Sequence, residues 1–408
     1  MFPEARDLLL SGGTVFEDET RRFVPGVDIL CRQGRIEAVG AGLAAAGATV
    51  VDCTGRYLIP GLIDCHVHIT SSGDVQDLTA GTRAPLPERS WKAAEYARRT
   101  LLAGVTTVRD MGAAERLNID LARAIDTGLL PGPTILAAGL GITMTGGHGH
   151  GFIAREADGP DDVRRAVREQ LRAGARAIKL FASGGVVTPG VDPRSPSLTQ
   201  DELAAAVDEG HKAFRVVGAH AQATEGIKNA VRAGVDSIEH GVWLDEEGVG
   251  LMLERGTYLV PTLSAPHHMA KAGVAGGVPS YMVEKSHQVL TDHLESYRAA
   301  LKAGVRVAMG TDQGTPLNRP GDNAQEVLRM AEHGLSAAGA LLAATAWAAD
   351  LLQVPAGRLT AGLAADILVL PADPLADLSI LTNHAEFAAI IKGGRPAAGR
   401  AIETGGTE

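Results

Sequence analysis

Two histidines separated by one residue close an apolar segment near residue 65. The segment reads Gly61-Leu62-Ile63-Asp64-Cys65-His66-Val67-His68. Along a β-strand, residues i and i+2 point to the same side, so a strand over 62–69 presents His66 and His68 together. Neutral imidazole is a good ligand for divalent zinc. The segment therefore predicts a strand whose end carries part of a metal site.

Short apolar segments later in the chain also end in residues that can bind or bridge a metal ion. A lone histidine in such a place is more often a core or surface residue, but several in one chain are hard to obtain by chance. If these strands form a β/α barrel, their C-terminal ends meet at the face where such barrels carry their chemistry. The residues are Lys179, His220, His240 and Asp312.

Lys179 lies inside the apolar segment Ala177-Ile178-Lys179-Leu180-Phe181-Ala182-Ser183. A buried ammonium group is costly without a partner. One interpretation is a lysine that extends its amine to water or forms an ion pair. The other is that its amine has reacted with carbon dioxide, which gives a carbamate whose two oxygens can bridge two metal ions.

The chain resembles the amidohydrolase superfamily and, within it, the branch of imidazolonepropionase-related enzymes that includes Xaa-Pro dipeptidase-like enzymes. The resemblance covers essentially the whole chain. It implies two divalent ions, expected to be zinc, with His66, His68 and Asp312 on the more buried ion and His220 and His240 on the more exposed one. Carbamylated Lys179 and a hydroxide would bridge them. Further matching motifs are Thr145-Gly146-Gly147-His148-Gly149, Ile178-Lys179, Ala219-His220-Ala221, Ile238-Glu239-His240-Gly241 and Gly310-Thr311-Asp312.

Alternating strand and helix patterns predict an α/β fold, a (β/α)8 TIM barrel, over residues 59–357. Both ends of the chain read as short strands, which predicts a smaller β-sandwich domain built from residues 1–58 and 358–408. Helical patterns lie between the barrel strands, for example over 161–173, 199–213 and 223–233. The expected barrel strands are 62–69, 106–111, 134–139, 177–182, 215–220, 236–240, 258–263 and 305–311.

Three residues are predicted to take part in catalysis: Asp312, Lys179 and His148. Metal ions lower the pKa of a shared water, and Asp312 would take the proton from the resulting hydroxide and pass it to the leaving nitrogen. His148, in a Gly-rich loop, is expected to contact substrate. Prolidase-like relatives tend to carry His-x-Tyr where this chain has His220-Ala221-Gln222. In those relatives the tyrosine contacts the substrate carboxylate, and this chain lacks it. Gln222 is expected to hydrogen-bond a substrate carboxylate or amide instead.

The predicted reaction is hydrolysis of an amide (C–N) bond by metal-activated hydroxide, on an Xaa-Pro-like dipeptide or an N-acyl amino acid. Opening of a cyclic amide, such as an imidazolone or hydantoin, is the alternative. Deamination is disfavoured because Lys179 is present and Ala223 stands where related deaminases have glutamate. An inactive scaffold on the same fold is disfavoured because no expected ligand is missing.

The expected partner is a small-molecule amide. The net charge is −10 and basic residues do not cluster, which disfavours nucleic acid and anionic membranes as partners. The three cysteines do not suggest a disulfide scaffold. No signal peptide or membrane span is evident, so a cytoplasmic location is expected. The resemblance favours a homo-oligomer.

Four histidines after the seventh strand are expected on an exposed helix and loop: His267, His268, His287 and His293.

Overall fold

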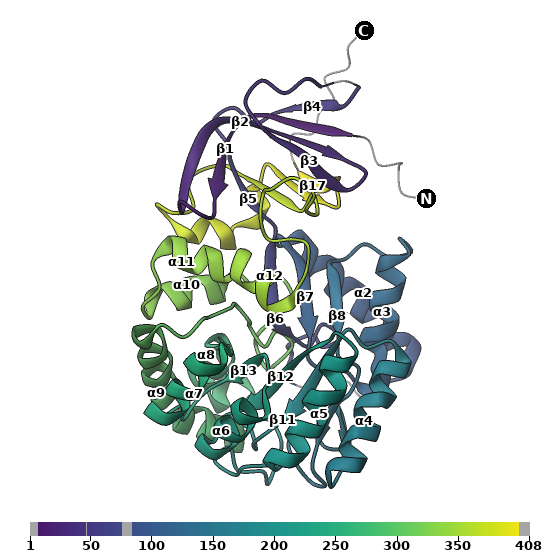
Figure 1. Ribbon diagram of the computed structural model, residues 1–408, viewed down its shortest axis with the longest axis vertical. Coiled ribbons are helices and arrows are strands. Elements are labelled where there is room, and N and C mark those ends of the chain that lie inside the picture. The colour runs from purple at the N-terminus through teal and green to yellow at the C-terminus, as the bar shows by residue number, and fades with distance from the viewer. Residues whose placement is uncertain (1–6, 46, 76–83, 400–408) are drawn as a thin grey trace.

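The structure is a computed structural model that describes residues 7–45, 47–75 and 84–399. Figure 1 shows a β-sheet at one end of the molecule and a larger body of strands and helices below it. The N-terminal strands and the C-terminal strands lie in the same sheet. Residues 1–6, in which the sequence shows no signal peptide, lie outside the described residues.

The end sheet contains eight strands in the described part of the chain, in the order β17-β16-β15-β5-β1-β2-β3, with β4 paired to β1. All eight belong to one hydrogen-bonded sheet, and β15 joins the two ends of the chain by pairing antiparallel with β5. Leucine, isoleucine and valine side chains form a separate small core within it. The strands are β1 (Leu8–Glu17), β2 (Arg22–Arg32), β3 (Arg35–Gly40), β4 (Thr49–Asp52), β5 (Tyr57–Pro60), β15 (Ile367–Leu370), β16 (Ala389–Lys392) and β17 (Arg395–Gly399).

The body contains two parallel sheets, one of three strands in the order β6-β7-β8 and one of six strands in the order β10-β9-β11-β12-β13-β14. Most of these strands are buried on both faces, as expected when helices cover a parallel sheet. They are β6 (Leu62–Val67), β7 (Val105–Asp110), β8 (Thr134–Ala137), β9 (Gly141–Thr143), β10 (Ala154–Glu156), β11 (Ala177–Phe181), β12 (Val216–Ala221), β13 (Ser237–His240) and β14 (Tyr258–Val260).

The segment expected as the eighth strand, 305–311, is not a regular strand. It makes single parallel bridges instead, Leu259 to Val307 and, just beyond the segment, Val67 to Gln313. The backbone N–H of Met309 donates to the Ala343 carbonyl at the end of helix α11 (Ala337–Ala343), at 2.8 Å, and not to a neighbouring strand. The protein thus has a mixed α/β fold with parallel sheets. The strand ladders do not close into one ring, so the eight-stranded barrel stays a prediction.

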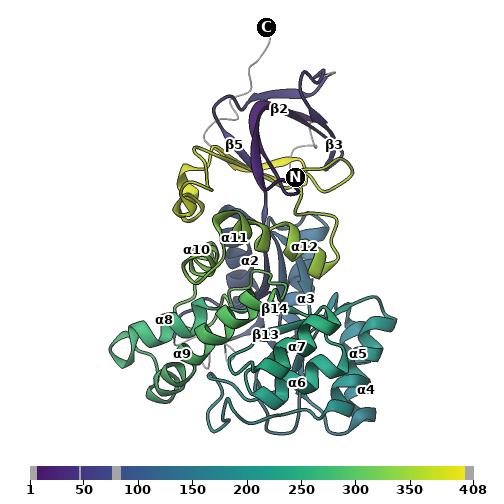
Figure 2. The same ribbon diagram turned by 60° about the vertical axis from the view of Figure 1, so that its left-hand side comes forward.

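Helices cover the outside of these sheets (Figures 1 and 2). Helix α5 begins with a capping box in which Thr199 and Glu202 each satisfy the other's backbone N–H. Helices α4, α6, α7 and α9 end at a glycine with left-handed backbone. The α-helices are α2 (Leu86–Leu102), α3 (Leu117–Asp126), α4 (Pro160–Ala173), α5 (Gln200–Lys212), α6 (Thr224–Ala233), α7 (Glu246–Arg255), α8 (Ser264–Ala272), α9 (Ser280–Ala303), α10 (Gln325–Glu332), α11 (Ala337–Ala343) and α12 (Ala346–Leu352); short 3-10 helices are η2 (Ala114–Arg116), η3 (Val274–Gly276), η4 (Leu378–Thr382) and η5 (His384–Glu386).

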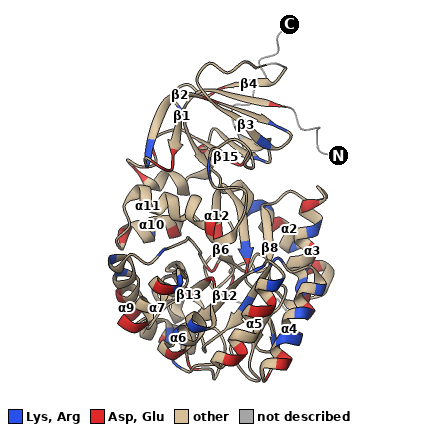
Figure 3. Cartoon of the chain, viewed as in Figure 1, with Lys and Arg blue, Asp and Glu red and all other residues tan. Residues whose placement is uncertain are grey.

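Charged side chains of both signs alternate over the outer helices, while the central strands carry few (Figure 3). Between α4 and α5 they form pairs, such as Arg168 with Glu209 at 2.8 Å. Arg168 is exposed whereas Glu209 is buried. Among the described helices, none is both long and apolar enough to cross a membrane.

Candidate active site

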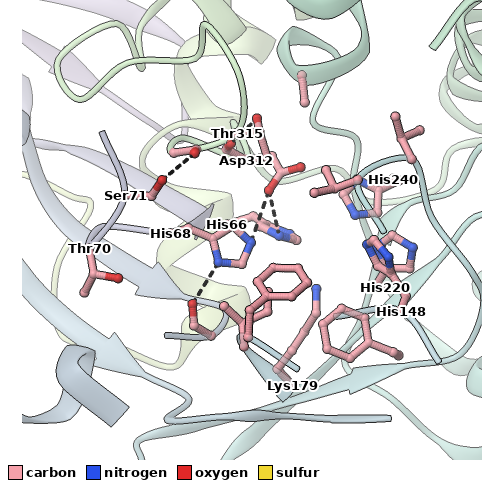
Figure 4. Close-up of a pocket in the computed structure, with 18 of the residues that line it drawn as sticks. His66, His68, Thr70, Ser71, His148, Lys179, His220, His240, Asp312 and Thr315 are labelled. Atoms are coloured by element: carbon pink, nitrogen blue, oxygen red, sulfur yellow. Dashed lines mark hydrogen bonds and ion pairs between the residues drawn. The ribbon is translucent and has the colours of Figure 1, made fainter. Parts of the chain in front are cut away.

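The six predicted metal-site residues line one pocket, at the ends of the parallel strands. His66 lies on β6 and His68 just after it. Lys179, His220 and His240 lie on β11, β12 and β13. Figure 4 shows these side chains, together with Asp312, gathered around a common centre. This arrangement follows from the fold, because parallel strands bring their C-terminal ends to one edge.

Asp312 lies between the two histidines of the first strand. Its Oδ1 is 3.4 Å from Nε2 of His66 and 3.3 Å from Nε2 of His68. Donor atoms of His66, His240 and Asp312 lie within 4.8 Å of one another, close enough to hold a metal ion. The ring of His220 is centred 4.4 Å from that of His240. The structure thus brings the predicted ligands into one pocket. The three within ligand distance of one another combine His240, predicted for the more exposed ion, with His66 and Asp312, predicted for the more buried one.

His66 and His68 each use one ring nitrogen, Nδ1, for a hydrogen bond to a partner outside the metal site. Nδ1 of His66 lies 2.8 Å from the Glu239 carboxylate. Nδ1 of His68 lies 2.9 Å from the carbonyl oxygen of Gly112. In both rings Nε2 is therefore the nitrogen left for the centre that Asp312 shares.

The other two histidines are held in the same manner but not by the same atom. His220 uses Nε2, which lies 2.8 Å from the carbonyl oxygen of Gly184, so its Nδ1 is left for the centre. His240 uses Nδ1, which lies 2.6 Å from Oγ1 of Thr262. An outer hydrogen bond that fixes the ring and its tautomer is typical of metal-binding histidines.

A buried ion pair supports this site from below. Glu239, which contacts His66, is 2.7 Å from Arg109, and both side chains are completely buried. Arg109 also donates to the carbonyl oxygen of Cys65 at 2.6 Å and to the hydroxyl of Ser237 at 3.0 Å. A fully hydrogen-bonded buried pair of this kind fixes the positions of its members. Glu239 belongs to the motif Ile238-Glu239-His240-Gly241, but the sequence alone predicts no role for it.

Burial keeps three of the imidazoles neutral. It lowers the pKa of His66, His220 and His240 well below the usual value, and the nearby positive groups lower it further. Burial also acts on His68, but Asp312 outweighs it and raises the pKa of that ring. Neutral imidazole is the form that binds metal ions.

Lys179 is 1% exposed and its ammonium lies 5.0 Å from the Phe181 ring. Burial lowers the pKa of its amine to about 8, although Glu239 and Asp312 act in the opposite direction. A substantial neutral fraction near neutral pH is required for reaction with carbon dioxide. A Cβ atom at position 141 would lie 2.5 Å from the Phe181 ring and 3.1 Å from the Lys179 stem, so Gly141 leaves room for both side chains.

Burial alone would raise the pKa of Asp312, but His66, His68 and Lys179 lower it to about 2. The carboxylate is therefore charged at neutral pH. Its backbone N–H donates to the carbonyl oxygen of His66 at 2.8 Å, which ties the residue to the first strand. Imidazole nitrogens, one carboxylate and one lysine form a donor set that fits divalent ions such as zinc. The residues present thus fit the metal ions that enzymes of this kind use.

The two predicted substrate contacts also line the pocket. Nδ1 of His148 lies 2.7 Å from the hydroxyl of Thr188, and its ring is centred 4.6 Å from that of His220. Burial, with Lys179 next, lowers the pKa of His148 to about 3. The backbone N–H of Gln222 donates to Ser183 at 2.8 Å. Its side-chain Oε1 is buried without a partner among the described residues.

The prediction that His293 is exposed is wrong. His293 is 1% exposed, lies on α9 and lines the pocket. Burial lowers the pKa of its ring to about 4, although backbone groups of Pro261 and His240 act in the opposite direction. Its position could have been found from the helical spacing of the buried residues Met282, Ser286 and Val289, which His293 continues. His287 is exposed as expected, whereas His267 and His268 are half-buried.

Known proteins resemble this chain in sequence. Residues 57–397 match the sequence profile described as the amidohydrolase family. The chain is 33% identical to an ochratoxinase of Aspergillus niger, over 83% of this chain and 75% of the relative. It is 30% identical to an imidazolonepropionase of Rhizobium rhizogenes, over 57% of this chain and 63% of the relative.

Solved structures resemble the whole chain. One is a prolidase complexed with N-methylphosphonate-L-proline, with 32% identity, a TM-score of 0.88 and coverage of 96% of this chain and 99% of that one. The chain therefore belongs to the amidohydrolase family and is a hydrolytic enzyme that acts on carbon–nitrogen bonds.

Proposed function

We propose that the protein is a binuclear metal-dependent hydrolase for amides whose amine half is an amino acid. Such substrates include Xaa-Pro-like dipeptides and N-acyl amino acids. The observation that carries this proposal is the set of four histidines, each with one nitrogen fixed by an outer partner, around Asp312 and Lys179. That arrangement suits metal ligands better than free acid–base groups.

His66, His68 and Asp312 would hold the more buried ion, and His220 and His240 the more exposed one. Carbamylated Lys179 would bridge the two, and its depressed pKa favours the neutral amine that forms the carbamate. We propose zinc because imidazole and carboxylate are common zinc ligands. When bound, the ions would activate water and polarise the scissile carbonyl group.

Asp312 would transfer the proton, and His148 would bind the substrate. Asp312 is charged and contacts both histidines of the first strand, so it can take a proton from the attacking water and return it to the leaving nitrogen. His148 is neutral at the pH of the reaction. When Thr188 donates its hydroxyl hydrogen to Nδ1 of His148, Nε2 carries the ring proton and can donate to a substrate oxygen.

The pocket walls support a substrate with an apolar body and a few polar atoms. The apolar part of the walls can accept an apolar group of the substrate. Its residues are Phe181, Val186, Pro266 and Met269. The unpartnered Oε1 of Gln222 can accept a hydrogen bond from a substrate N–H, and the side-chain NH2 of the same residue can donate to a substrate carboxylate. His293 lines the same pocket. The similar prolidase structure with a phosphonate derivative of proline agrees with an amino acid as the amine half.

Matched substrates test this proposal. We expect N-acyl amino acids and dipeptides with a free carboxylate to have a higher kcat/KM than their C-terminal amides. The enzyme should be loaded with zinc and bicarbonate before the assay. Equal kcat/KM for acid and amide would show that the enzyme does not recognise the substrate carboxylate, and it would favour a neutral substrate.

Opening of a cyclic amide is the second candidate. The partial similarity to an imidazolonepropionase supports it. Turnover of an imidazolone or hydantoin above that of every dipeptide and N-acyl amino acid in a panel would select this function.

We also propose that the two parallel sheets are parts of one closed (β/α)8 barrel over residues 59–357, with the end sheet as a second domain from 1–58 and 358–408. Backbone contacts at both joins support this. The N–H of Arg176 donates to the Ala137 carbonyl at 2.8 Å, and that of Cys65 to the Met309 carbonyl at 2.8 Å.

We propose a homo-oligomer, which sedimentation analysis can test.

A further inference from the structure

The loop between β11 and α5, residues 184–197, contacts two histidines of the site. The carbonyl oxygen of Gly184 accepts from His220 at 2.8 Å. The hydroxyl of Thr188 lies 2.7 Å from Nδ1 of His148. The path of this loop therefore sets the orientation of one proposed ligand and one proposed substrate contact.

The loop passes very close to these residues. A Cβ atom at position 185 would lie 2.5 Å from Nε2 of His148, and one at position 184 would collide with the backbone carbonyl of Asp192. Only glycine permits so close an approach. A small displacement of the loop would therefore be felt directly at His148.

The ammonium group of Lys285, on helix α9, lies where three carbonyl groups of this loop converge. Its Nζ is 3.2 Å from the oxygen of Gly185, 2.9 Å from that of Thr188 and 2.6 Å from that of Val191. A protonated lysine has three N–H donors, so the three carbonyl groups use all of them. Lys285 is half-buried and forms no ion pair with a carboxylate in the described residues.

Other contacts join the same helix to the loop. The hydroxyl of Tyr281 donates to the Val187 carbonyl at 3.0 Å. The indole N–H of Trp243 donates to Asp292 of α9 at 2.5 Å, and the guanidinium of Arg194 lies 4.7 Å from the centre of the Trp243 ring. Lys285 is nevertheless the only one of these side chains that contacts three loop carbonyl groups at once.

We propose that Lys285 is a positioning residue. Its ammonium occupies a cation site formed by the loop carbonyl groups of Gly185, Thr188 and Val191. By neutralising three converging carbonyl dipoles it holds the loop against α9, and through the loop it holds His148 and His220. Without a cation there, the carbonyl oxygens repel one another and the loop moves away from the site.

Chemical rescue provides the test. In Lys285→Ala we expect faster amide hydrogen exchange in residues 184–197 and a kcat/KM lower by about tenfold, as for the loss of charged hydrogen bonds. Propylammonium, which replaces the lost side chain, should reverse both effects saturably. Neither 1-propanol nor tetramethylammonium should do so, because the first lacks the charge and the second lacks N–H donors.

Lys271→Ala, at an exposed lysine of α8, is the matched control and should respond to none of these compounds. The exchange measurement does not require a known substrate, so the inference can fail or hold separately from the proposed function. Wild-type exchange and kcat/KM in Lys285→Ala, or a defect that propylammonium does not change, would overturn it.

A second comparison applies if Lys285→Ala does not fold. Lys285→Met retains the apolar stem, and Thr188→Val removes the contact with His148. If Lys285 acts through the loop, the two changes should lower kcat/KM by less together than the product of their separate effects. Fully multiplicative effects would contradict the proposal.

Discussion

Nδ1 of His66 lies 2.8 Å from Oε2 of Glu239, and both side chains are almost completely buried. Because burial keeps His66 neutral, its single ring proton is on Nδ1, where Glu239 accepts it. The lone pair of Nε2 is then directed at the centre shared with Asp312. Glu239 is held in turn by Arg109 at 2.7 Å. This chain of contacts prepares one proposed ligand before any ion binds.

The first prediction concerns that contact. Glu239→Gln keeps the size of the side chain but removes the charge that pairs with Arg109 and the proper acceptor for His66. Loss of such an outer partner typically costs about 10–100-fold in metal affinity. Competition with a chelator measures the affinity, and Glu254→Gln, an exposed change on α7, is the control. Unchanged affinity would show that Glu239 serves only the core.

The second prediction concerns Lys179. Lys179→Ala should lose most turnover, because the proposed bridge between the ions is gone. Short-chain carboxylic acids should restore part of it, since a carboxylate can replace the carbamate. Lys212→Ala, at an exposed lysine, should remain active and insensitive to these acids. Near-normal turnover of Lys179→Ala would disprove the carbamate.

The third prediction concerns Asp312, which is proposed both to bind an ion and to move a proton. Asp312→Asn retains an oxygen ligand but not the base. Loss of general acid–base help typically lowers the rate by ~10²–10⁴-fold. We expect such a fall in kcat with the metal content largely retained. Full activity of the metal-loaded variant would refute the proton transfer.

The fourth prediction concerns the pH dependence of stability. Burial raises the pKa of Glu326 to about 7, despite hydrogen bonds from Ser264 and from the backbone N–H of Leu263. Between pH 4.5 and 7 the folded chain therefore retains a proton that the unfolded chain releases. This group makes the free energy of unfolding fall as pH rises through that range, by on the order of 3 kcal/mol.

Glu326→Gln removes this titration. Relative to wild type, the variant should gain free energy of unfolding as the pH rises from 5 to 7.5, as measured by urea denaturation of protein with the same metal content. Glu332→Gln, at the exposed end of the same helix, should run parallel to wild type. A constant difference between Glu326→Gln and wild type over this range would contradict the raised pKa.

The positions of the proposed ligands could be predicted from sequence because they depend on local rules. The spacing of His66 and His68 gives a shared side of a strand, and the ends of parallel strands meet at one edge. The contacts that hold the rings could not be predicted in this way. His66 and Glu239 are 173 residues apart, and Lys285 and Gly185 are 100 apart. Such pairs follow from packing and not from periodicity.

Two expectations failed for identifiable reasons. The sequence predicts His293 on an exposed helix or loop as one of four histidines in the same stretch, yet the buried side of α9 includes it. Residues 305–311 were expected as a regular strand because they are apolar. The structure has single bridges there, because the N–H of Met309 donates to the Ala343 carbonyl and not to a neighbouring strand. Asp312 follows this segment, and its carboxylate lies beside His66 and His68.

Metal stoichiometry tests the central claim most directly. Protein purified without chelator and reconstituted with zinc and bicarbonate should contain two ions per chain by elemental analysis. Lys179→Ala, treated identically, should contain fewer. Saturation of the wild-type protein at one ion per chain under excess zinc and bicarbonate would contradict the binuclear site.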